Sequence, residues 1–324
     1  DAFAQSLVDE VIPSSLKARF EQEGEVDCSY SVEDVGRFRA NVFRQQGRLC
    51  LVFRRISSEI PSMEELLLPA KQLMQLAALQ RGLVIVTGTT GAGKSTTLAS
   101  MVDYMNHHFA RHIITVEDPI EYVHIDRKSM INQREVGFDT RDYAAALRHV
   151  VRQTPDVIMV GEMRDQETVR AALAAAETGH LVLSTLHTIN AVQSVERILG
   201  FFPPHQHEEL RMQLSLTLEG IVSQRLLPRK NDQSRVPAVE ILLATPTIRD
   251  LLYEGKTREL HKAIYEGMHY YGTQTFQQSI TYLYREGVIT YEDALSASDN
   301  PDELKLELRG ITKGSASADF DFNL

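Results

Sequence analysis

The sequence predicts an α/β fold in which helices cover both faces of a parallel sheet, with a small α+β region before it and helices after it. Four short, mostly apolar runs, LVIVTG, HIITVED, DVIMVGE and HLVLSTLHT, alternate in part with helical segments. Near-continuous apolar strands separated by helices are typical of a parallel sheet that is buried on both sides. Residues 1–58 instead alternate apolar with polar side chains, and the strand signal fades beyond residue 203.

Composition and charge narrow the class of protein. The chain has 324 residues, of which 43% are hydrophobic, and no run approaches the roughly 20 apolar residues that cross a membrane. We therefore expect a soluble globular protein of one large or two ordinary domains, without direct membrane insertion. The net charge of -10 argues against a nucleic-acid partner, because a protein that grips nucleic acid needs a basic face.

The cysteines and the first residue bear on the compartment. Cys28 and Cys50 are too few for a disulfide framework or a four-cysteine zinc site, so we expect half-buried thiols in a reducing compartment and no zinc. No signal peptide is recognised. Because the chain opens on Asp1 rather than methionine, we expect that N-terminal residues are missing from it.

Residues 1–58 predict a helical segment that ends at Gly24, followed by three half-buried strands. A hairpin turn is expected at Gln46-Gly47, between GRFRANVFRQQ and GRLCLVFRRI. On the first of these two strands alternation places Arg37 and Arg39 on one face, opposite an apolar face. Arg54 belongs to the next strand, so the small sheet presents arginines that are either solvated charges or functional groups.

The later part of the chain predicts mainly helices. The segment PPHQHEELRMQLSLTLEGIVSQRLL carries apolar residues at helical spacing as far as Val222, and VPAVEILLAT fits one further strand. PTIRDLLYEG, TQTFQQSITYLYREG and TYEDALSAS are expected to be helices. Residues 59–69 predict a linker punctuated by prolines, and residues 311–324 predict a disordered tail.

A glycine-rich loop between a strand and a helix carries the strongest chemical signal. GTTGAGKST fits G-x-x-x-x-G-K-[ST], in which glycines let backbone N–H groups wrap a phosphate while the helix N-terminus adds favourable partial charge. Lys94 is expected to reach the β- and γ-phosphates of ATP, and Ser95 to hold Mg²⁺. The predicted nucleotide-binding residues are Gly88, Thr89, Thr90, Gly91, Ala92, Gly93, Lys94, Ser95 and Thr96.

Carboxylates follow two of the predicted strands. Glu162 ends one apolar strand, while Glu117, Asp118 and Glu121 lie at or just past the end of another. Because ligands bind outside the carboxyl ends of parallel strands, all four can face the phosphate loop. Glu162 suits the Mg²⁺ side, directly or through water, and Glu121 suits the positioning of water. Glu117 and Asp118 fit a supporting role, and helix capping or solvation remains the alternative for these acids.

Two histidines bracket the strand in GHLVLSTLHT. His180 and His187 are seven residues apart, so they face opposite sides of a strand, which weakens a metal-pair interpretation. His187 lies at the carboxyl end, beside the phosphate loop, and fits a sensor of the γ-phosphate. His180 lies at the other end and fits a brace to a neighbouring element. The remaining clustered histidines predict surface positions.

Four motifs in this order resemble the secretion-superfamily ATPases that drive type IV pili and type II secretion. They are the Walker A loop GTTGAGKST, the aspartate box ITVEDPIEYVH, the Walker B element PDVIMVGEMRDQET and the histidine box ETGHLVLSTLHT. The likeness runs over almost the whole chain. It implies a partial PAS-like domain over residues 1–58 and, over residues 70–310, a RecA-like P-loop ATPase domain with a helical C-terminal part. It also implies a homo-hexamer with nucleotide bound between the two domains.

The resemblance also implies roles for single residues. Lys94 and Ser95 would bind ATP and Mg²⁺, Glu162 would be the Walker B acid, and Glu121 the catalytic base. It favours Arg39 and Arg54 as γ-phosphate contacts over solvated charges, and it implies that both bracketing histidines matter. Arg197 matches a family arginine that either crosses to a neighbouring subunit or forms a structural ion pair.

Two features point to a branch of this family. After IVSQRLL, where extension and type II secretion ATPases carry a four-cysteine zinc module, this chain has only PRKNDQSR, which favours retraction enzymes. TIRDLLYE stands where retraction enzymes of the PilT type carry AIRNLIRE, and the tail is small and acidic, so both features favour the accessory PilU type.

The leading hypothesis is a cytoplasmic ATPase motor, peripheral at the inner-membrane base of the pilus. It would power or assist type IV pilus retraction and twitching motility, with a PilT paralogue and an inner-membrane platform protein as partners. A type IV secretion or conjugation ATPase and a ring-forming adaptor with little turnover are the alternatives.

Overall fold

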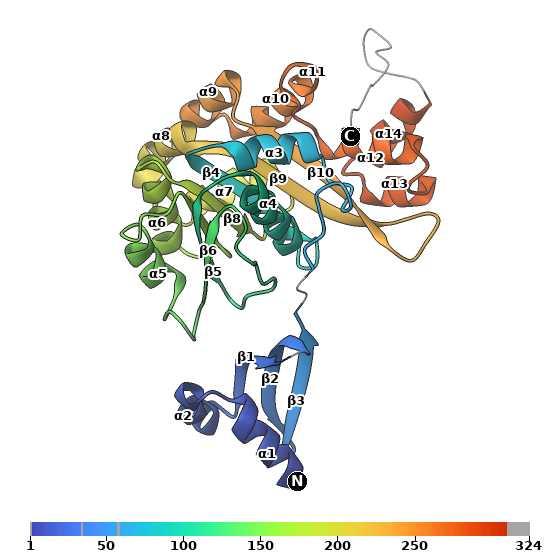
Figure 1. The fold of residues 1–324 in the computed structure, drawn as a ribbon. Helices are drawn as coiled ribbons and strands as arrows, with labels where there is room; N and C mark the ends of the chain where they lie inside the picture. The colour runs from blue at the N-terminus through green and yellow to red at the C-terminus, as the bar shows by residue number, and fades with distance from the viewer. Residues whose placement is uncertain (1, 34, 57–58, 310–324) are drawn as a thin grey trace.

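The fold contains two sheets, which lie in separate parts of the computed structural model (Figure 1). The structure describes residues 2–33, 35–56 and 59–309, so the predicted tail lies outside the described residues. The small sheet is antiparallel with the order β1-β2-β3, and the large sheet has seven strands in the order β10-β9-β4-β8-β7-β5-β6. The large sheet is parallel except for its antiparallel edge strand β10, and the predicted α/β class is confirmed.

The small sheet has two helices packed on one face. Its elements are α1 (Ala2–Val11), α2 (Ser14–Glu23), β1 (Glu25–Val32), β2 (Gly36–Gln45) and β3 (Arg48–Arg55). The single helical segment expected here is interrupted at Pro13, whose ring cannot continue a helix. Gly24 ends α2 with a φ of 79°, and positive φ at Gln46 and Gly47 gives the expected hairpin turn. Ala40 and Val42 are fully buried against the helices.

Alternate residues of the large sheet face two apolar layers. The strands are β4 (Gly82–Thr87), β5 (His112–Glu117), β6 (Met130–Glu135), β7 (Val157–Val160), β8 (Leu181–Leu186), β9 (Leu218–Pro228) and β10 (Arg235–Leu243). In β4, Leu83 and Ile85 join the larger apolar cluster, whereas Val84 and Val86 join the layer formed with α3 and α4. The four apolar strands predicted from the sequence are β4, β5, β7 and β8, and the structure confirms them at the centre of the sheet.

Helices cover both faces and form the C-terminal part. One layer contains α3 (Ala70–Ala78) and α4 (Lys94–His108). The other contains α5 (Tyr143–Val150), α6 (Gln166–Glu177), α7 (Ala191–Gly200), α8 (His207–Thr217), α9 (Pro246–Glu254) and α10 (Leu260–Glu266). The short α11 (Met268–Tyr271) precedes a group made of α12 (Phe276–Arg285), α13 (Tyr291–Ala297) and α14 (Pro301–Leu308), which packs on the far end of the β9–β10 hairpin (Figure 1). Within the described ranges, no helix combines the length and apolarity needed to span a bilayer.

The helix predicted as far as Val222 is wrong beyond Thr217, because the chain changes there from α8 to β9. β9 pairs in parallel with β4 and antiparallel with β10, and its β-branched residues Ile221 and Val222 are fully buried. Gly220 allows this close packing, since a Cβ there would lie 2.8 Å from Leu76 Cδ2. Sheet pairing and burial on both faces therefore override the helical spacing of the leucines.

A buried carboxyl group on β10 holds the start of α7. Glu240 is 3% exposed, and its Oε1 accepts a hydrogen bond from the backbone N–H of Ala191 at 2.7 Å. Ala191 is the first residue of α7, so this contact fixes the chain just after the predicted histidine box. Burial raises the pKa of Glu240 to about 7, because the ionised form loses its hydration.

We predict that Glu240→Gln removes a pH dependence of stability. In the wild type this carboxyl is protonated in the folded state and ionised in the unfolded state between pH 4.5 and about 7, so stability falls as pH rises through that window. The glutamine keeps the acceptor oxygen but does not ionise. The free energy of unfolding of Glu240→Gln, relative to wild type, should rise by up to about 3 kcal/mol across the window, measured by urea unfolding. Glu177→Gln, at an exposed position in α6, should give a flat difference.

We also predict that Gly220→Ala destabilises the large sheet by at least about 1 kcal/mol in urea unfolding, because the new methyl group collides with Leu76 and approaches the Leu242 carbonyl. Gly200→Ala is the matched control. Gly200 ends α7 and a Cβ there meets no atom within 4 Å, so this change should leave stability unchanged or slightly higher. Equal stability of the two variants would contradict the packing argument.

Candidate active site

The phosphate loop connects β4 to α4, and its backbone requires glycine. Gly88, Gly91 and Gly93 have φ values of 144°, 78° and 90°, which L side chains rarely adopt. A Cβ on Gly88 would lie only 2.6 Å from the carbonyl oxygen of Gln224 in β9. No described side chain caps the start of α4, so its first N–H groups remain available to an anion. The loop therefore fits a phosphate group.

Lys94 lies inside this loop. Its Nζ donates hydrogen bonds to the carbonyl oxygens of Gly88 and Thr89, at 2.9 and 3.0 Å, and lies 3.4 Å from Nδ1 of His187. Burial lowers the pKa of Lys94, and the negative charges of Glu162 and Glu121 oppose that shift. Among the described residues, the contacts of this buried amine are two carbonyl dipoles and a ring nitrogen, an arrangement that suits an incoming anion.

Glu162 and His187 lie next to Lys94. Nε2 of His187 is 3.4 Å from Oε2 of Glu162, so the ring stands between the lysine and the carboxylate. Arg164 donates from Nε to the same oxygen at 2.7 Å, and this hydrogen bond raises the pKa of the guanidinium. The two strands β7 and β8 are adjacent, which brings these groups together as the sequence predicted.

Glu117 is buried behind the site. It is 8% exposed, and its Oε1 accepts hydrogen bonds from Thr115 Oγ1 at 2.7 Å and from Gln133 Nε2 at 3.0 Å. Burial raises the pKa of Glu117. Gln133 also donates to the carbonyl oxygen of Tyr122, so the pair supports the segment that carries Asp118 and Glu121.

Two adjoining pockets, of about 480 and 530 Å³, lie over the phosphate loop. Both are lined by Arg39, Lys94, Ser95 and Glu121. The first also contains Arg54, Arg55 and Arg235, and the second also contains Asp27, Glu117, Asp118, Glu162 and His187.

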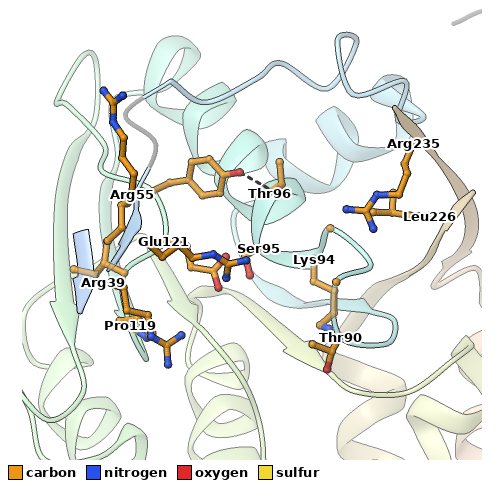
Figure 2. A pocket seen from close by; sticks show the side chains of 16 residues that line it. Arg39, Arg55, Thr90, Lys94, Ser95, Thr96, Pro119, Glu121, Leu226 and Arg235 are labelled. Atoms are coloured by element: carbon orange, nitrogen blue, oxygen red, sulfur yellow. Dashed lines mark hydrogen bonds between the residues drawn. The ribbon is translucent and has the colours of Figure 1, made fainter. Parts of the chain in front are cut away.

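Figure 2 shows Arg39 and Arg55 on one side of the first pocket and Arg235 with Leu226 on the other, with Ser95 and Glu121 between them. Hydroxyl and carboxylate oxygens are ligands that Mg²⁺ takes, so Ser95 and Glu162 fit that ion.

Sequence reasoning missed several residues of these pockets. Arg55 directly follows Arg54 at the end of β3 and lines the first pocket as well. Arg235, the first residue of β10, lies in the segment PRKNDQSR, from which the sequence predicts no site residue. Oδ1 of Asp27 lies 3.4 Å from Nε of Arg39, so the two side chains form an ion pair. The hydroxyl groups of Tyr122 and Thr96 are 3.0 Å apart (Figure 2). Only the doubled arginine was a signal in the sequence, because the other contacts depend on the fold.

His180 and Arg197 do not line either pocket. Nδ1 of His180 is 2.9 Å from the carbonyl oxygen of Ala175, at the end of α6. The His180 carbonyl accepts the N–H of Gly82, so the residue joins α6 and β4 at the amino end of β8. The Arg197 guanidinium stacks over the ring of Phe201 at 4.7 Å, and no ion pair of Arg197 occurs within the described ranges.

Comparison with known proteins agrees with this geometry. The family described as Type II/IV secretion system protein matches residues 4–290. The chain is 46% identical to the type IV pilus ATPase PilU of Pseudomonas aeruginosa over 92% of its length and 78% of that protein. It is 43% identical to the type IV pilus retraction ATPase PilT of the same organism, over 92% and 86% of the two chains.

Solved structures give the same result. A crystal structure of the pilus retraction motor PilT with bound ADP superposes with a TM-score of 0.86 at 49% identity, covering 93% of this chain and 85% of that one. The ATPase DotB of Legionella pneumophila follows with a TM-score of 0.77 at 27% identity, covering 94% and 82%. Together with the order of the four motifs, these matches show that the chain belongs to the Type II/IV secretion system protein family and resembles its pilus retraction ATPases.

Proposed function

We propose that this protein is a Mg²⁺-dependent ATPase motor that powers or assists the retraction of type IV pili, as an accessory motor of the PilU type. The observation that carries the proposal is the convergence of the phosphate loop, Glu162, Glu121 and the arginines of the small sheet on two adjoining pockets. The similarity to PilU and PilT supports the retraction assignment over a general nucleotide-binding role.

The proposed roles follow from position. Lys94 would exchange its carbonyl partners for the β- and γ-phosphates, and Ser95 with Glu162 would hold Mg²⁺, which neutralises phosphate charge. Glu121, which is exposed and lines both pockets, would position or deprotonate the attacking water. Arg39 and Arg54 would stabilise charge on the γ-phosphate, a contribution worth ~10³–10⁵ in rate in comparable enzymes.

The proposed motor cycle uses both parts of the chain. ATP would draw the arginines of residues 1–58 towards the ATPase domain of residues 70–310, with residues 59–69 as the linker. Hydrolysis and release would let the cleft open. In a homo-hexamer on the cytoplasmic side of the inner membrane, successive openings would turn a pilus platform protein, together with a PilT paralogue.

A type IV secretion ATPase is a second candidate because the matching family is described as Type II/IV secretion system protein. The identities of 46% to the pilus ATPase PilU and 49% to the retraction motor PilT favour the first proposal. Deleting the gene and scoring twitching motility against substrate secretion separates the two. Turnover of the purified chain, with and without PilT, separates a motor from an adaptor that has little turnover.

Lys94→Ala tests the active site. We expect ATP turnover by the purified chain to fall by at least about 10²-fold, because the variant lacks the cation that faces the transferred phosphate. Phosphate release at saturating ATP and Mg²⁺ is the measurement, and Lys262→Ala, at an exposed position in α10, is the matched control. Undiminished turnover in Lys94→Ala would contradict the assignment.

His187→Ala tests the sensor role. Because the ring lies between Lys94 and Glu162, we expect loss of discrimination between ATP and ADP and a fall in turnover of about 10-fold or more, with ADP affinity nearly unchanged. Nucleotide titrations by calorimetry and a turnover assay check this. His180→Ala, which removes a contact to α6, should lower stability but keep the ATP-to-ADP affinity ratio. Normal turnover and discrimination in His187→Ala would exclude the sensor role.

A further inference from the structure

One carboxylate outside the two pockets joins the small sheet to the ATPase domain. Glu135, the last residue of β6, has a side chain that is only 5% exposed. It accepts a hydrogen bond from Ser29 Oγ at 2.7 Å and one from Arg37 Nη2 at 2.9 Å, both from the small sheet. It also accepts the backbone N–H of Ile120 at 3.3 Å, from the segment that carries the proposed catalytic base, Glu121.

Hydrogen bonds hold the backbone of Glu135 in place on the large sheet. Its own N–H donates to Asp139 Oδ2 at 2.8 Å, and its carbonyl oxygen accepts N–H groups from the turn that follows β6. The next residue, Val136, donates its N–H to the carbonyl oxygen of Glu117 at 2.8 Å. The carboxylate is therefore anchored to the large sheet beside Glu117, while its oxygens reach across to the other part of the chain.

Each partner of Glu135 is close in sequence to a group that lines the pockets. Arg37 and Arg39 lie on the same face of β2, about 7 Å apart along the strand, and Arg39 lines both pockets. Ile120 directly precedes Glu121, which lines both pockets as well. A single carboxylate thus sets the distance between an arginine of the small sheet and an acid of the ATPase domain.

The free-energy cost of burying the Glu135 carboxylate favours a contact with the small sheet that is either complete or absent. A buried carboxylate is tolerated only when charged and polar donors replace its hydration, and here a guanidinium, a hydroxyl and an N–H do so. Withdrawing the small sheet removes two of these three donors and returns the charge to solvent. Glu135 therefore favours one closed arrangement of the cleft rather than a range of partly closed ones.

We propose that Glu135 is a positioning residue that clamps the small sheet, through Arg37 and Ser29, onto the segment carrying Glu121, so that Arg39 and Glu121 face the same phosphate. The effect on turnover rests on the proposed ATPase function. The effect on the arrangement of the two parts does not, and a separate measurement tests it.

Glu135→Gln tests the catalytic consequence, because it keeps an acceptor oxygen but loses the charge that holds Arg37. We expect kcat for ATP hydrolysis to fall by about 10-fold or more with KM changed by less than about 3-fold, since misplacement of Arg39 affects the chemical step. In an Arg39→Ala background the same change should have no further effect on kcat. A merely structural ion pair would instead give independent, multiplicative losses.

Glu219→Gln is the matched control for this experiment. Glu219 pairs with Arg249 at the same 2.9 Å, but both residues lie in the large part of the chain and line neither pocket. This variant should keep kcat and KM. An unchanged kcat in Glu135→Gln, or an equal loss in the Arg39→Ala background, would overturn the proposed coupling to Arg39.

A distance measurement tests the clamp without any turnover. Spin labels at exposed positions 17 and 177, in a chain with Cys28 and Cys50 replaced by serine, report the separation of α2 and α6 in the intact 324-residue chain. We expect a narrow distance distribution in the labelled parent and a broader, longer one in Glu135→Gln. Identical distributions would overturn the clamp. A chain without ATPase activity whose distribution still broadens would contradict the proposed function and leave the clamp supported.

Discussion

The site depends on the common direction of four neighbouring strands. Because β4, β5, β7 and β8 run parallel, their carboxyl ends lie at one edge of the sheet. The phosphate loop, the segment of Glu121, Glu162 and His187 each leave one of these ends. The small sheet, which is separate from the large sheet, adds arginines to the first pocket. Reversing any one strand would move its functional group to the opposite edge.

Local signals in the sequence were sufficient for the part of the site that follows these strands. The glycine pattern of residues 88–93 and the acid after an apolar run at Glu162 each depend on a few adjacent residues. β9 could not be predicted, because its leucines also fit a helix and only pairing with β4 and β10 decides between the two. β6 is a short edge strand that is mostly polar, and Arg235 reaches the pocket only through the β9–β10 hairpin.

The charges of the site are balanced within an acidic chain. Lys94 and the arginines face the loop, while Glu117 is buried behind it and Glu162 is occupied by Arg164. Asp27 occupies Arg39 in a similar way. Lys94, Arg39 and Arg164 thus already have partners inside the protein, so an incoming phosphate competes with those partners for these three cations. Such competition lets the site change its internal pairing when the phosphate arrives and when it leaves.

The β9 strand places three successive residues in three different environments. The carbonyl of Gln224 packs against Gly88, and its side chain donates to Thr97 of α4. Arg225 stacks on Phe276 of α12 and donates to the Ala297 carbonyl, and Leu226 lines the first pocket. The contacts of β9 with the phosphate loop and with the C-terminal helices are therefore made by adjacent residues, about 3.4 Å apart along the strand. A displacement of those helices therefore reaches the loop through the side-chain contacts of Arg225 and a single step of β9 backbone.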